Sequence, residues 1–170
     1  VFRGGRKPDV LRDRINYQVM GANIWKHAPS IDAMSDDARV LYLSAAKSGE
    51  TYTLSERPDA PADALSQIVD FSDRSTSLGD HYPSPIIGKA LDASSGLLFE
   101  SAPFDAPIDI SGFFSGELHL TTDRKDLDFS VTLYQRMPSG ELFHLSYFLG
   151  RASYADDMTS RRLLTPGKKT

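Results

Sequence analysis

Apolar and polar residues alternate with a period of two over residues 126–154. The apolar positions are Leu127, Phe129, Val131 and Leu133 before an interruption at Met137-Pro138-Ser139-Gly140, and Phe143, Leu145 and Tyr147 after it. Such alternation is typical of a strand with one face in a core, and a short Pro/Gly segment between two such runs predicts a β-hairpin. This hairpin is the strongest structural signal in the sequence.

Shorter runs of the same kind occur along the rest of the chain. We expect strands at residues 15–20, 39–46, 52–54, 67–71 and 97–99, and strand character at residues 117–121. Turn residues separate these runs, and no long stripe of helical period is present. Many short strands with turns between them predict an all-β fold, and specifically an antiparallel jelly-roll β-sandwich.

Residues 72–95 interrupt this pattern with Ser, Thr, Asp, Gly and Pro. A polar loop of this length in a compact domain is usually functional or mobile. His81 and Tyr82 lie in it and are candidates for ligand contact. Trp25, the only tryptophan, and His27 are candidates for a ligand or interdomain contact surface, although aromatic side chains at strand spacing more often belong to a core.

Composition narrows the function classes. The chain has 170 residues, of which 40% are hydrophobic and 25% charged, as expected for one globular domain. The net charge is −4 and Lys and Arg are scattered, which argues against nucleic-acid binding. No apolar run approaches the ~20 residues that a membrane span needs, so we expect no membrane partner. The sequence leaves the compartment open.

No catalytic or metal-binding pattern stands out. The chain has no cysteine, and its four histidines share no metal-ligand spacing. Ser44-Ala45-Ala46-Lys47 matches a Ser-x-x-Lys pattern but falls at the end of an expected strand rather than at the start of a helix. We interpret the carboxylates Asp123, Asp126 and Asp128 as a charged turn, because a calcium loop usually includes a glycine. We therefore predict no catalytic residue, cofactor or metal in this chain.

Several segments, in order, resemble one domain family. They are 16–25 (Asn-Tyr-Gln-Val-Met-Gly-Ala-Asn-Ile-Trp), 107–112, 123–133, the Pro138-Ser139-Gly140 turn, and 150–154 (Gly-Arg-Ala-Ser-Tyr). Together they resemble the C-terminal non-catalytic domain of X-prolyl dipeptidyl-peptidases, which also occurs in cocaine esterase and in α-amino-acid ester hydrolases. The resemblance spans roughly residues 12 to 165.

The resemblance implies a galactose-binding-like jelly roll attached to an α/β-hydrolase domain that holds the whole Ser-His-Asp triad. On this basis residues 1–11 are expected to be a linker from an upstream hydrolase domain, and residues 12–170 the jelly roll, truncated at its C-terminus. The implied work is to pack on the hydrolase core, to help shape its substrate cleft and to support oligomer contacts. Open sheet edges in a truncated jelly roll also predict self-association. The full-length protein is then a serine hydrolase acting on esters, amides or Xaa-Pro peptides, whereas this chain carries no triad.

Two alternatives remain open. In the first alternative, the chain is a carbohydrate-binding module that uses Trp25 or the His81–Tyr82 loop as a stacking surface. In the second, it is a structural, oligomerising β-domain without a ligand. An exposed, flat aromatic patch would favour the first of these alternatives, and aromatics in the core would count against it.

Overall fold

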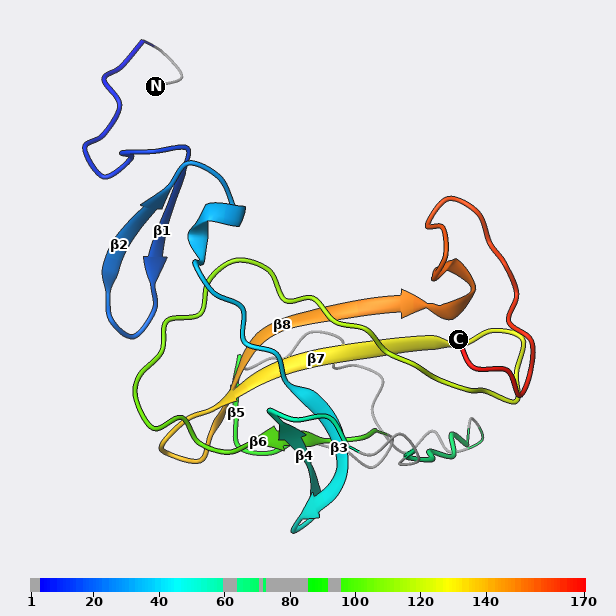
Figure 1. The fold of residues 1–170 in the computed structure, drawn as a ribbon. Helices are drawn as coiled ribbons and strands as arrows, with labels where there is room; N and C mark the ends of the chain where they lie inside the picture. The colour runs from blue at the N-terminus through cyan, green and yellow to red at the C-terminus, as the bar shows by residue number, and fades with distance from the viewer. Residues whose placement is uncertain (1–3, 60–63, 71, 73–85, 92–95) are drawn as a thin grey trace. The chain divides into compact units, whose positions relative to one another are not determined.

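The structure is a computed structural model, which describes residues 4–59, 64–70, 72, 86–91 and 96–170 (Figure 1). The chain divides into two compact units. Unit 1 comprises residues 1–66 and 97–115, and unit 2 comprises residues 67–96 and 116–170. Each unit is therefore built from two separate stretches of the chain.

The described residues form eight strands and two short 3-10 helices, with no α-helix among them. In chain order the elements are β1 (Ile15–Val19), β2 (Ile24–Ala28), η1 (Asp32–Met34), β3 (Tyr42–Ser48), β4 (Thr51–Ser55), β5 (Ile87–Gly88), β6 (Phe99–Ser101), β7 (Asp128–Arg136), β8 (Leu142–Arg151) and η2 (Ala152–Tyr154). The strands form three small sheets, β1-β2, β3-β4-β6 and β5-β8-β7, and none of these sheets closes on itself.

In unit 1, β1 and β2 form an antiparallel hairpin whose register pairs Gln18 with Trp25. Its turn contains two residues in the left-handed region, Gly21 with φ 83° and Asn23 with φ 57°. Gly and Asn adopt this conformation more readily than other residues, which explains why the chain reverses here. The Asn23 amide donates to the Val19 carbonyl oxygen at 2.9 Å and closes the turn.

The second sheet of unit 1 places β4 between β3, with which it is antiparallel, and β6, with which it is parallel. The β3–β4 register shifts between Leu43 and Lys47, and the displaced backbone amides find side-chain acceptors. The Ala45 amide donates to Asp59 Oδ2 at 2.7 Å, and the Ala46 amide donates to Ser44 Oγ at 3.0 Å. These bonds satisfy donors that the irregular pairing would otherwise leave unpaired.

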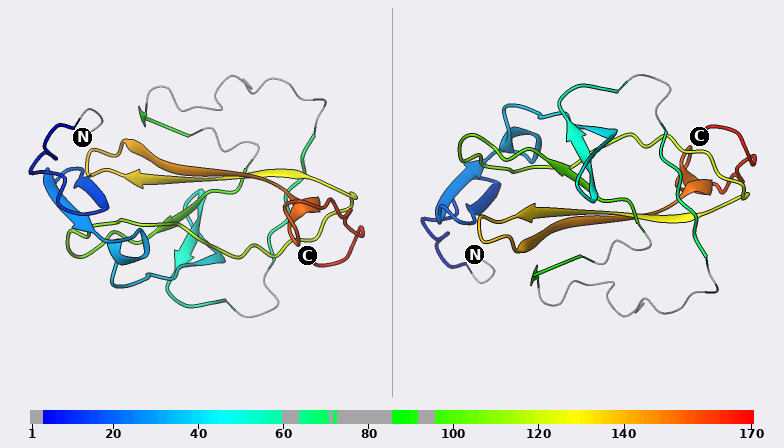
Figure 2. Two further views of the ribbon diagram at one scale, coloured as in Figure 1. Left: turned by 90° about the horizontal axis from the view of Figure 1, so that it is seen from above. Right: turned by 90° about the horizontal axis from the view of Figure 1, so that it is seen from below.

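In unit 2, β7 and β8 form the long hairpin that the sequence predicts, drawn in yellow and orange in Figure 2. At its turn the Met137 amide donates to the Glu141 carbonyl oxygen at 2.8 Å, and the Gly140 amide donates to the Met137 carbonyl oxygen at 2.8 Å. Gly140 has φ 87°, which explains the glycine at this position. The short strand β5 pairs with the first residues of β8, with Ile87 opposite Phe143.

A bulge at Leu145 changes which side chains share a face of β8. Leu133 pairs with Ser146, whereas the next residue, Tyr134, pairs with His144, so that Leu145 is the extra residue. Because side chains alternate between faces, the bulge puts His144 on the same face as Tyr147. The predicted common face of Phe143, Leu145 and Tyr147 is therefore wrong, because the bulge reverses the alternation.

Gly150 lies beneath two aromatic rings of the same hairpin. It pairs with Phe129, and the rings of Phe129 and Phe148 are 6.0 Å apart between centroids. A Cβ atom at Gly150 would lie 2.6 Å from Phe129 Cζ and 2.7 Å from a Phe148 ring carbon. The missing side chain thus leaves room for both rings to lie over the backbone.

Few side chains are buried. Among the described residues only Ala28, Leu142 and Ala152 are buried hydrophobics, and Ser44 and Ser153 are buried polar residues. Large apolar side chains are exposed in both units, including Phe148 at 53% and Leu149 at 64%. The apolar faces that the strands create are thus only partly covered.

The predicted all-β class is confirmed at the level of a mostly β chain, whereas the jelly-roll sandwich is not confirmed. Strands predicted at 15–20, 39–46, 52–54 and 97–99 correspond to β1, β3, β4 and β6, with ends that shift by up to three residues. The strand predicted at 67–71 is wrong for its described part, since residues 67–70 form no strand and Ile68 is 94% exposed. Residues 117–121 also form no strand; Leu120 instead exchanges two backbone hydrogen bonds with Thr170, each 2.9 Å long.

The crowding above Gly150 leads to a testable prediction. Gly150→Ala should lower the local opening free energy of the β7–β8 amides by about 1–3 kcal/mol, because the new methyl group displaces the Phe129 and Phe148 rings. Hydrogen exchange of the hairpin amides measures this change. Gly116→Ala is the matched control, because a Cβ there meets nothing within 4 Å. Equal exchange in the two variants would show that the rings do not need the glycine.

Candidate functional site

An open hollow lies on one face of the β1–β2 hairpin in unit 1. It has a volume of about 250 Å³ and is lined by Asp9, Val10, Arg12, Trp25 and His27. Trp25 and His27 are two apart on β2, so that their side chains leave the same face of the hairpin. The Trp25 side chain is 48% exposed, which leaves much of the indole accessible from the hollow.

Hydrogen bonds fix the His27 ring. Asn16, which pairs with His27 across the hairpin, donates from Nδ2 to the Asp13 carbonyl oxygen at 2.7 Å and accepts the Asp13 amide at 3.1 Å. These two bonds define which end of the Asn16 amide is oxygen. His27 Nδ1 lies 2.8 Å from Asn16 Oδ1, and because an amide oxygen only accepts, Nδ1 carries the proton. In the neutral ring, Nε2 is then the acceptor.

The opposite face of the hairpin is tied to the rest of unit 1. Lys26 Nζ forms an ion pair with Asp109 Oδ2 at 2.7 Å, and the Lys26 pKa is raised by this hydrogen bond. The Tyr17 hydroxyl donates to the Met34 carbonyl oxygen at 3.4 Å, and the Ser111 hydroxyl donates to the same oxygen at 2.8 Å. These contacts attach the face of the hairpin that carries Tyr17 and Lys26 to other residues of unit 1. The face that carries Trp25 is left partly exposed.

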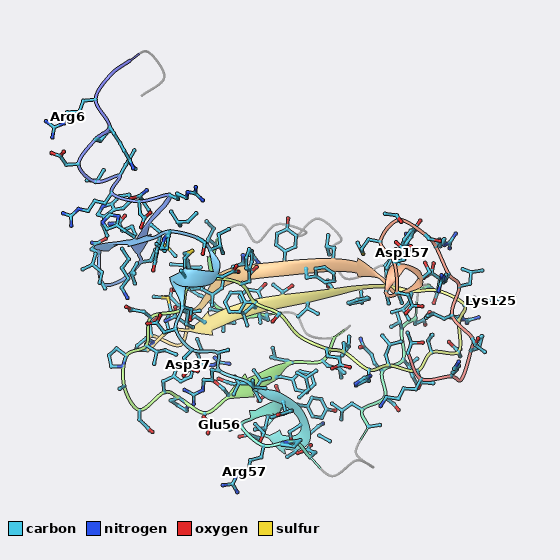
Figure 3. The ribbon with its side chains drawn as sticks, turned by 45° about the horizontal axis from the view of Figure 1, so that its top comes forward. Arg6, Asp37, Glu56, Arg57, Lys125 and Asp157 are labelled. Carbon is cyan, nitrogen blue, oxygen red and sulfur yellow. The ribbon has the colours of Figure 1, made fainter. Side chains whose placement is uncertain are left out.

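The segment before the hairpin forms the other side of the hollow. Arg6 Nη2 lies 2.8 Å from Asp9 Oδ1, and Figure 3 labels Arg6 on this segment. The Leu11 amide donates to the Pro8 carbonyl oxygen at 3.0 Å and turns the chain toward β1. The structure therefore brings together Trp25 and His27, two of the four predicted contact residues. The other two, His81 and Tyr82, lie outside the described residues.

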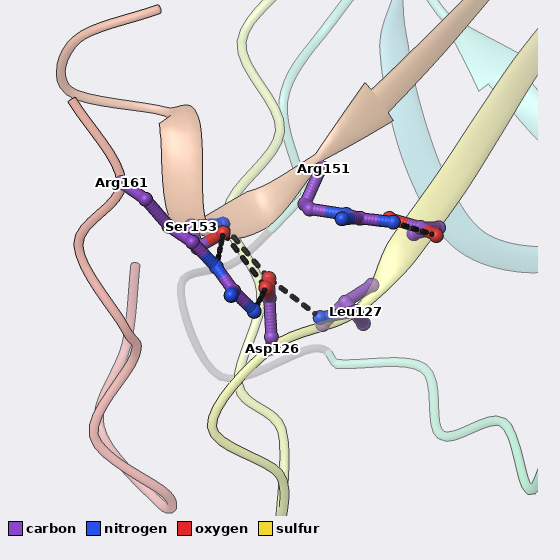
Figure 4. Close-up of polar contacts among 6 residues, drawn as sticks. Asp126, Leu127, Arg151, Ser153 and Arg161 are labelled. Carbon is purple, nitrogen blue, oxygen red and sulfur yellow. Dashed lines mark hydrogen bonds and ion pairs between the residues drawn. The ribbon is translucent and has the colours of Figure 1, made fainter. Parts of the chain in front are cut away.

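A second cluster of polar contacts is centred on Asp126 in unit 2 (Figure 4). Its carboxylate accepts hydrogen bonds from the Ser153 amide at 3.0 Å, the Ser153 hydroxyl at 2.7 Å, the Leu127 amide at 3.0 Å and Arg161 Nη2 at 2.8 Å. The Asp126 side chain is 18% exposed, so that it is largely enclosed by these donors. Beside it, Arg151 binds Asp128 through two hydrogen bonds of 2.5 and 2.8 Å.

The environment of Asp126 favours the charged carboxylate. Burial raises the pKa of Asp126, but the hydrogen bonds from Arg161, Ser153 and Leu127 outweigh burial and lower this pKa to about 2. The Asp128 pKa is lowered as well, by its hydrogen bonds with Arg151. Both carboxylates are thus engaged in holding cations and amides of their own unit.

The Asp126 cluster anchors the C-terminal segment 155–170 to the residues that precede β7. The Leu164 amide donates to the Lys125 carbonyl oxygen at 2.8 Å, and the Gly167 amide donates to the Thr122 carbonyl oxygen at 2.8 Å. Figure 3 shows Lys125 and Asp157 at the same end of the β7–β8 hairpin. We conclude that the predicted charged turn is a structural clasp, a role that sequence reasoning did not assign to Asp126.

The His144 ring packs against aromatic side chains of both strands of the β7–β8 hairpin. Its ring lies 5.3 Å from the Tyr134 ring in an edge-to-face arrangement and 6.0 Å from the Tyr147 ring. Its Nε2 atom is buried and has no hydrogen-bond partner among the described residues. This aromatic group lies on the face of β8 that the Leu145 bulge creates.

Ser44 and Lys47 of the Ser-x-x-Lys pattern form no hydrogen bond with each other among the described residues, and each has other local partners. Ser44 is buried, its hydroxyl accepts the Ala46 amide, and Lys47 Nζ lies 5.0 Å from the centre of the Tyr52 ring. The Ser-x-x-Lys pattern therefore lies on strand β3 and is engaged in local contacts. Among the described residues no group of three or more His, Asp or Glu side chains is arranged to hold a metal ion. Within the same residues, no helix combines the length and the apolar character that a membrane crossing requires.

Comparison with known proteins identifies the class of domain. A family model described as X-Pro dipeptidyl-peptidase C-terminal non-catalytic domain matches residues 11–170. The chain therefore belongs to this family, as its sequence resemblance predicts. The searches of curated proteins and of solved structures found no match.

The pKa of Asp126 leads to a prediction about acid. Because the folded-state pKa of about 2 is below the ordinary value of 3.8, the clasp contributes its full stability above about pH 4. That contribution should be lost as the pH falls from about 4 towards 2, and segment 155–170 should then detach. An NMR titration of the Ser153 amide resonance should show a midpoint near pH 2.

Asp126→Asn tests the assignment of this titration, and Asp123→Asn is its control, because the Asp123 side chain is 84% exposed. The Asp126 variant should lack the Ser153 transition, whereas the Asp123 variant should keep it. A Ser153 midpoint at an ordinary carboxylate pKa in the unmodified chain would contradict the clasp.

Proposed function

We propose that this chain serves as the accessory domain of a serine hydrolase of the X-Pro dipeptidyl-peptidase or acyl esterase type. It packs on a catalytic α/β-hydrolase domain of the same protein, helps to shape the substrate cleft and supports contacts between subunits. The full-length enzyme then hydrolyses Xaa-Pro peptides, amides or esters with a triad held in the other domain. The family match carries this proposal, because its description names a C-terminal, non-catalytic domain.

The exposed apolar surface of the β7–β8 hairpin supports a packing role. Val131 and Phe148 pair across the hairpin and share one face, and they are 52% and 53% exposed. Leu149 lies on the other face and is 64% exposed. Covering apolar area gains roughly 25 cal/mol per Å², so that a protein contact on either face would be favourable.

The open edge of β7 supports a role in assembly. Within the described residues β7 pairs with β8 alone, so that the second edge of this nine-residue strand carries no partner strand. An unpaired edge of this length favours pairing with another strand. We infer that a further strand, from the rest of a jelly roll or from a second copy of the chain, completes this sheet.

One substitution tests the packing role. In the full-length enzyme, Leu149→Asp should weaken the contact between the accessory and catalytic domains, because a carboxylate would have to lose its hydration at an apolar contact. We expect a lower melting temperature, by several degrees, and a lower kcat/KM.

Gln135→Asp is the control, since it adds the same charge to an exposed polar position of the same hairpin. The control should behave like the unmodified enzyme. If both variants kept the stability and the activity of the unmodified enzyme, this face of β8 would not be a domain contact.

A further inference from the structure

The Trp25 hollow is separate in the chain from the apolar hairpin that the proposed function uses. It lies on the β1–β2 hairpin of unit 1, and its lining combines one aromatic ring with several polar groups. We propose that this hollow binds a neutral pyranose sugar. The proposal goes beyond the accessory role, which it neither requires nor replaces.

The indole supplies a platform for such a ring. Trp25 is 48% exposed and belongs to a strand, where its pairing with Gln18 fixes the backbone. Gln18 is itself held by a hydrogen bond from its Nε2 to Asn23 Oδ1 at 3.0 Å. A flat aromatic surface packs well against the C–H face of a saturated ring.

The polar groups around the indole match hydroxyl groups, which both donate and accept. When the His27 ring is neutral, its Nε2 is an acceptor, because Nδ1 donates its proton to Asn16. Arg12 supplies only donors, and the Asp9 carboxylate supplies only acceptors. A ligand with several neighbouring hydroxyls can hydrogen-bond to all of these groups, whereas an aliphatic ligand can hydrogen-bond to none of them.

The charge of the lining favours a neutral ligand. The hollow is lined by charges of both signs, the Asp9 carboxylate and the Arg12 guanidinium. Asp9 is also ion-paired with Arg6 at 2.8 Å. An anion would be repelled by Asp9 and a cation by Arg12, whereas a neutral ligand is repelled by neither.

The size of the hollow favours one small ring over a protein segment. A volume of about 250 Å³ lies just below the usual range of ligand pockets, and its lining mixes polar and apolar side chains. A protein contact at Trp25 is the competing interpretation, and the experiment below separates the two.

The test uses the whole 170-residue chain, whose only tryptophan makes its fluorescence a reporter of the hollow. Methyl β-D-galactopyranoside and methyl β-D-glucopyranoside are the probes, and the acyclic polyol sorbitol is the control for hydroxyl groups without a ring. We expect a saturable change of Trp25 emission with at least one pyranoside and no saturable change with sorbitol.

Saturation-transfer NMR extends the test to variants. Trp25→Ala should abolish transfer to the pyranoside, and His27→Ala should weaken binding by about tenfold, which corresponds to one lost hydrogen bond of ordinary strength. His27→Gln, which retains an acceptor, should recover part of the affinity. Met20→Ala is the matched control, because Met20 is 69% exposed on the same hairpin and does not line the hollow.

Two results would overturn the proposal. One is the absence of a saturable response to either pyranoside in the folded chain. The other is unchanged sugar binding by Trp25→Ala. If the sugars were inert and Trp25→Ala weakened binding to the catalytic domain, the hollow would be a protein contact instead. None of these results bears on the Leu149 experiment, since Leu149 lies on β8 of unit 2.

Discussion

The described residues bury little apolar surface, and this limits how much the hydrophobic effect can stabilise the fold. Ordering each residue costs roughly 1–2 kcal/mol of backbone entropy, and burial of apolar side chains is the main term that offsets this cost. Among the described residues, the only buried hydrophobic side chains are those of Ala28, Leu142 and Ala152. None of the large aromatic side chains is buried among them. Many large apolar side chains of the described strands, such as Phe148 and Leu149, remain partly exposed. The proposed packing on a catalytic domain would bury some of them. Such packing agrees with a domain whose family is defined by attachment to an enzyme.

Polar contacts of defined geometry supply much of the order that the core does not. In unit 2 the Asp126 carboxylate holds Ser153 and Arg161, and through them segment 155–170, against the start of β7. In unit 1 the Lys26–Asp109 ion pair and the bonds to the Met34 carbonyl oxygen hold the β1–β2 hairpin. Such contacts position elements well but stabilise them modestly, because their groups were hydrated before folding. Order without a large core is therefore the common property of both units.

Local patterns predicted local structure well. The alternation around Phe129 and the Pro/Gly turn located the β7–β8 hairpin, and the family resemblance identified the domain over almost its whole length. The bulge at Leu145 could not be predicted, because no residue type in the sequence marks it. Its effect is to reverse which side chains share a face of β8. The prediction of a strand at 67–71 was wrong for its described part. Apolar residues such as Ile68 suggested a buried strand, yet Ile68 is exposed.

The candidate sites show the same division. Trp25 and His27 could be selected from the sequence because a lone tryptophan two residues from a histidine is an unusual surface feature, and the structure places both in one hollow. The contribution of Asp9 and Arg12 could not be predicted, since it depends on how the chain folds back before β1. The contacts of Asp126 could not be predicted, because its partners, Ser153 and Arg161, lie 27 and 35 residues away in the sequence.

Hydroxyl-radical footprinting of Val131, Phe148 and Leu149 tests the central claim most directly. The measurement compares oxidation rates in the 170-residue chain with those in the full-length enzyme, and uses the exposed Met158 as an internal reference. If the β7–β8 hairpin is buried against the catalytic part, at least one of its faces should be oxidised several-fold more slowly in the full-length enzyme. Equal rates in the two proteins would contradict the account.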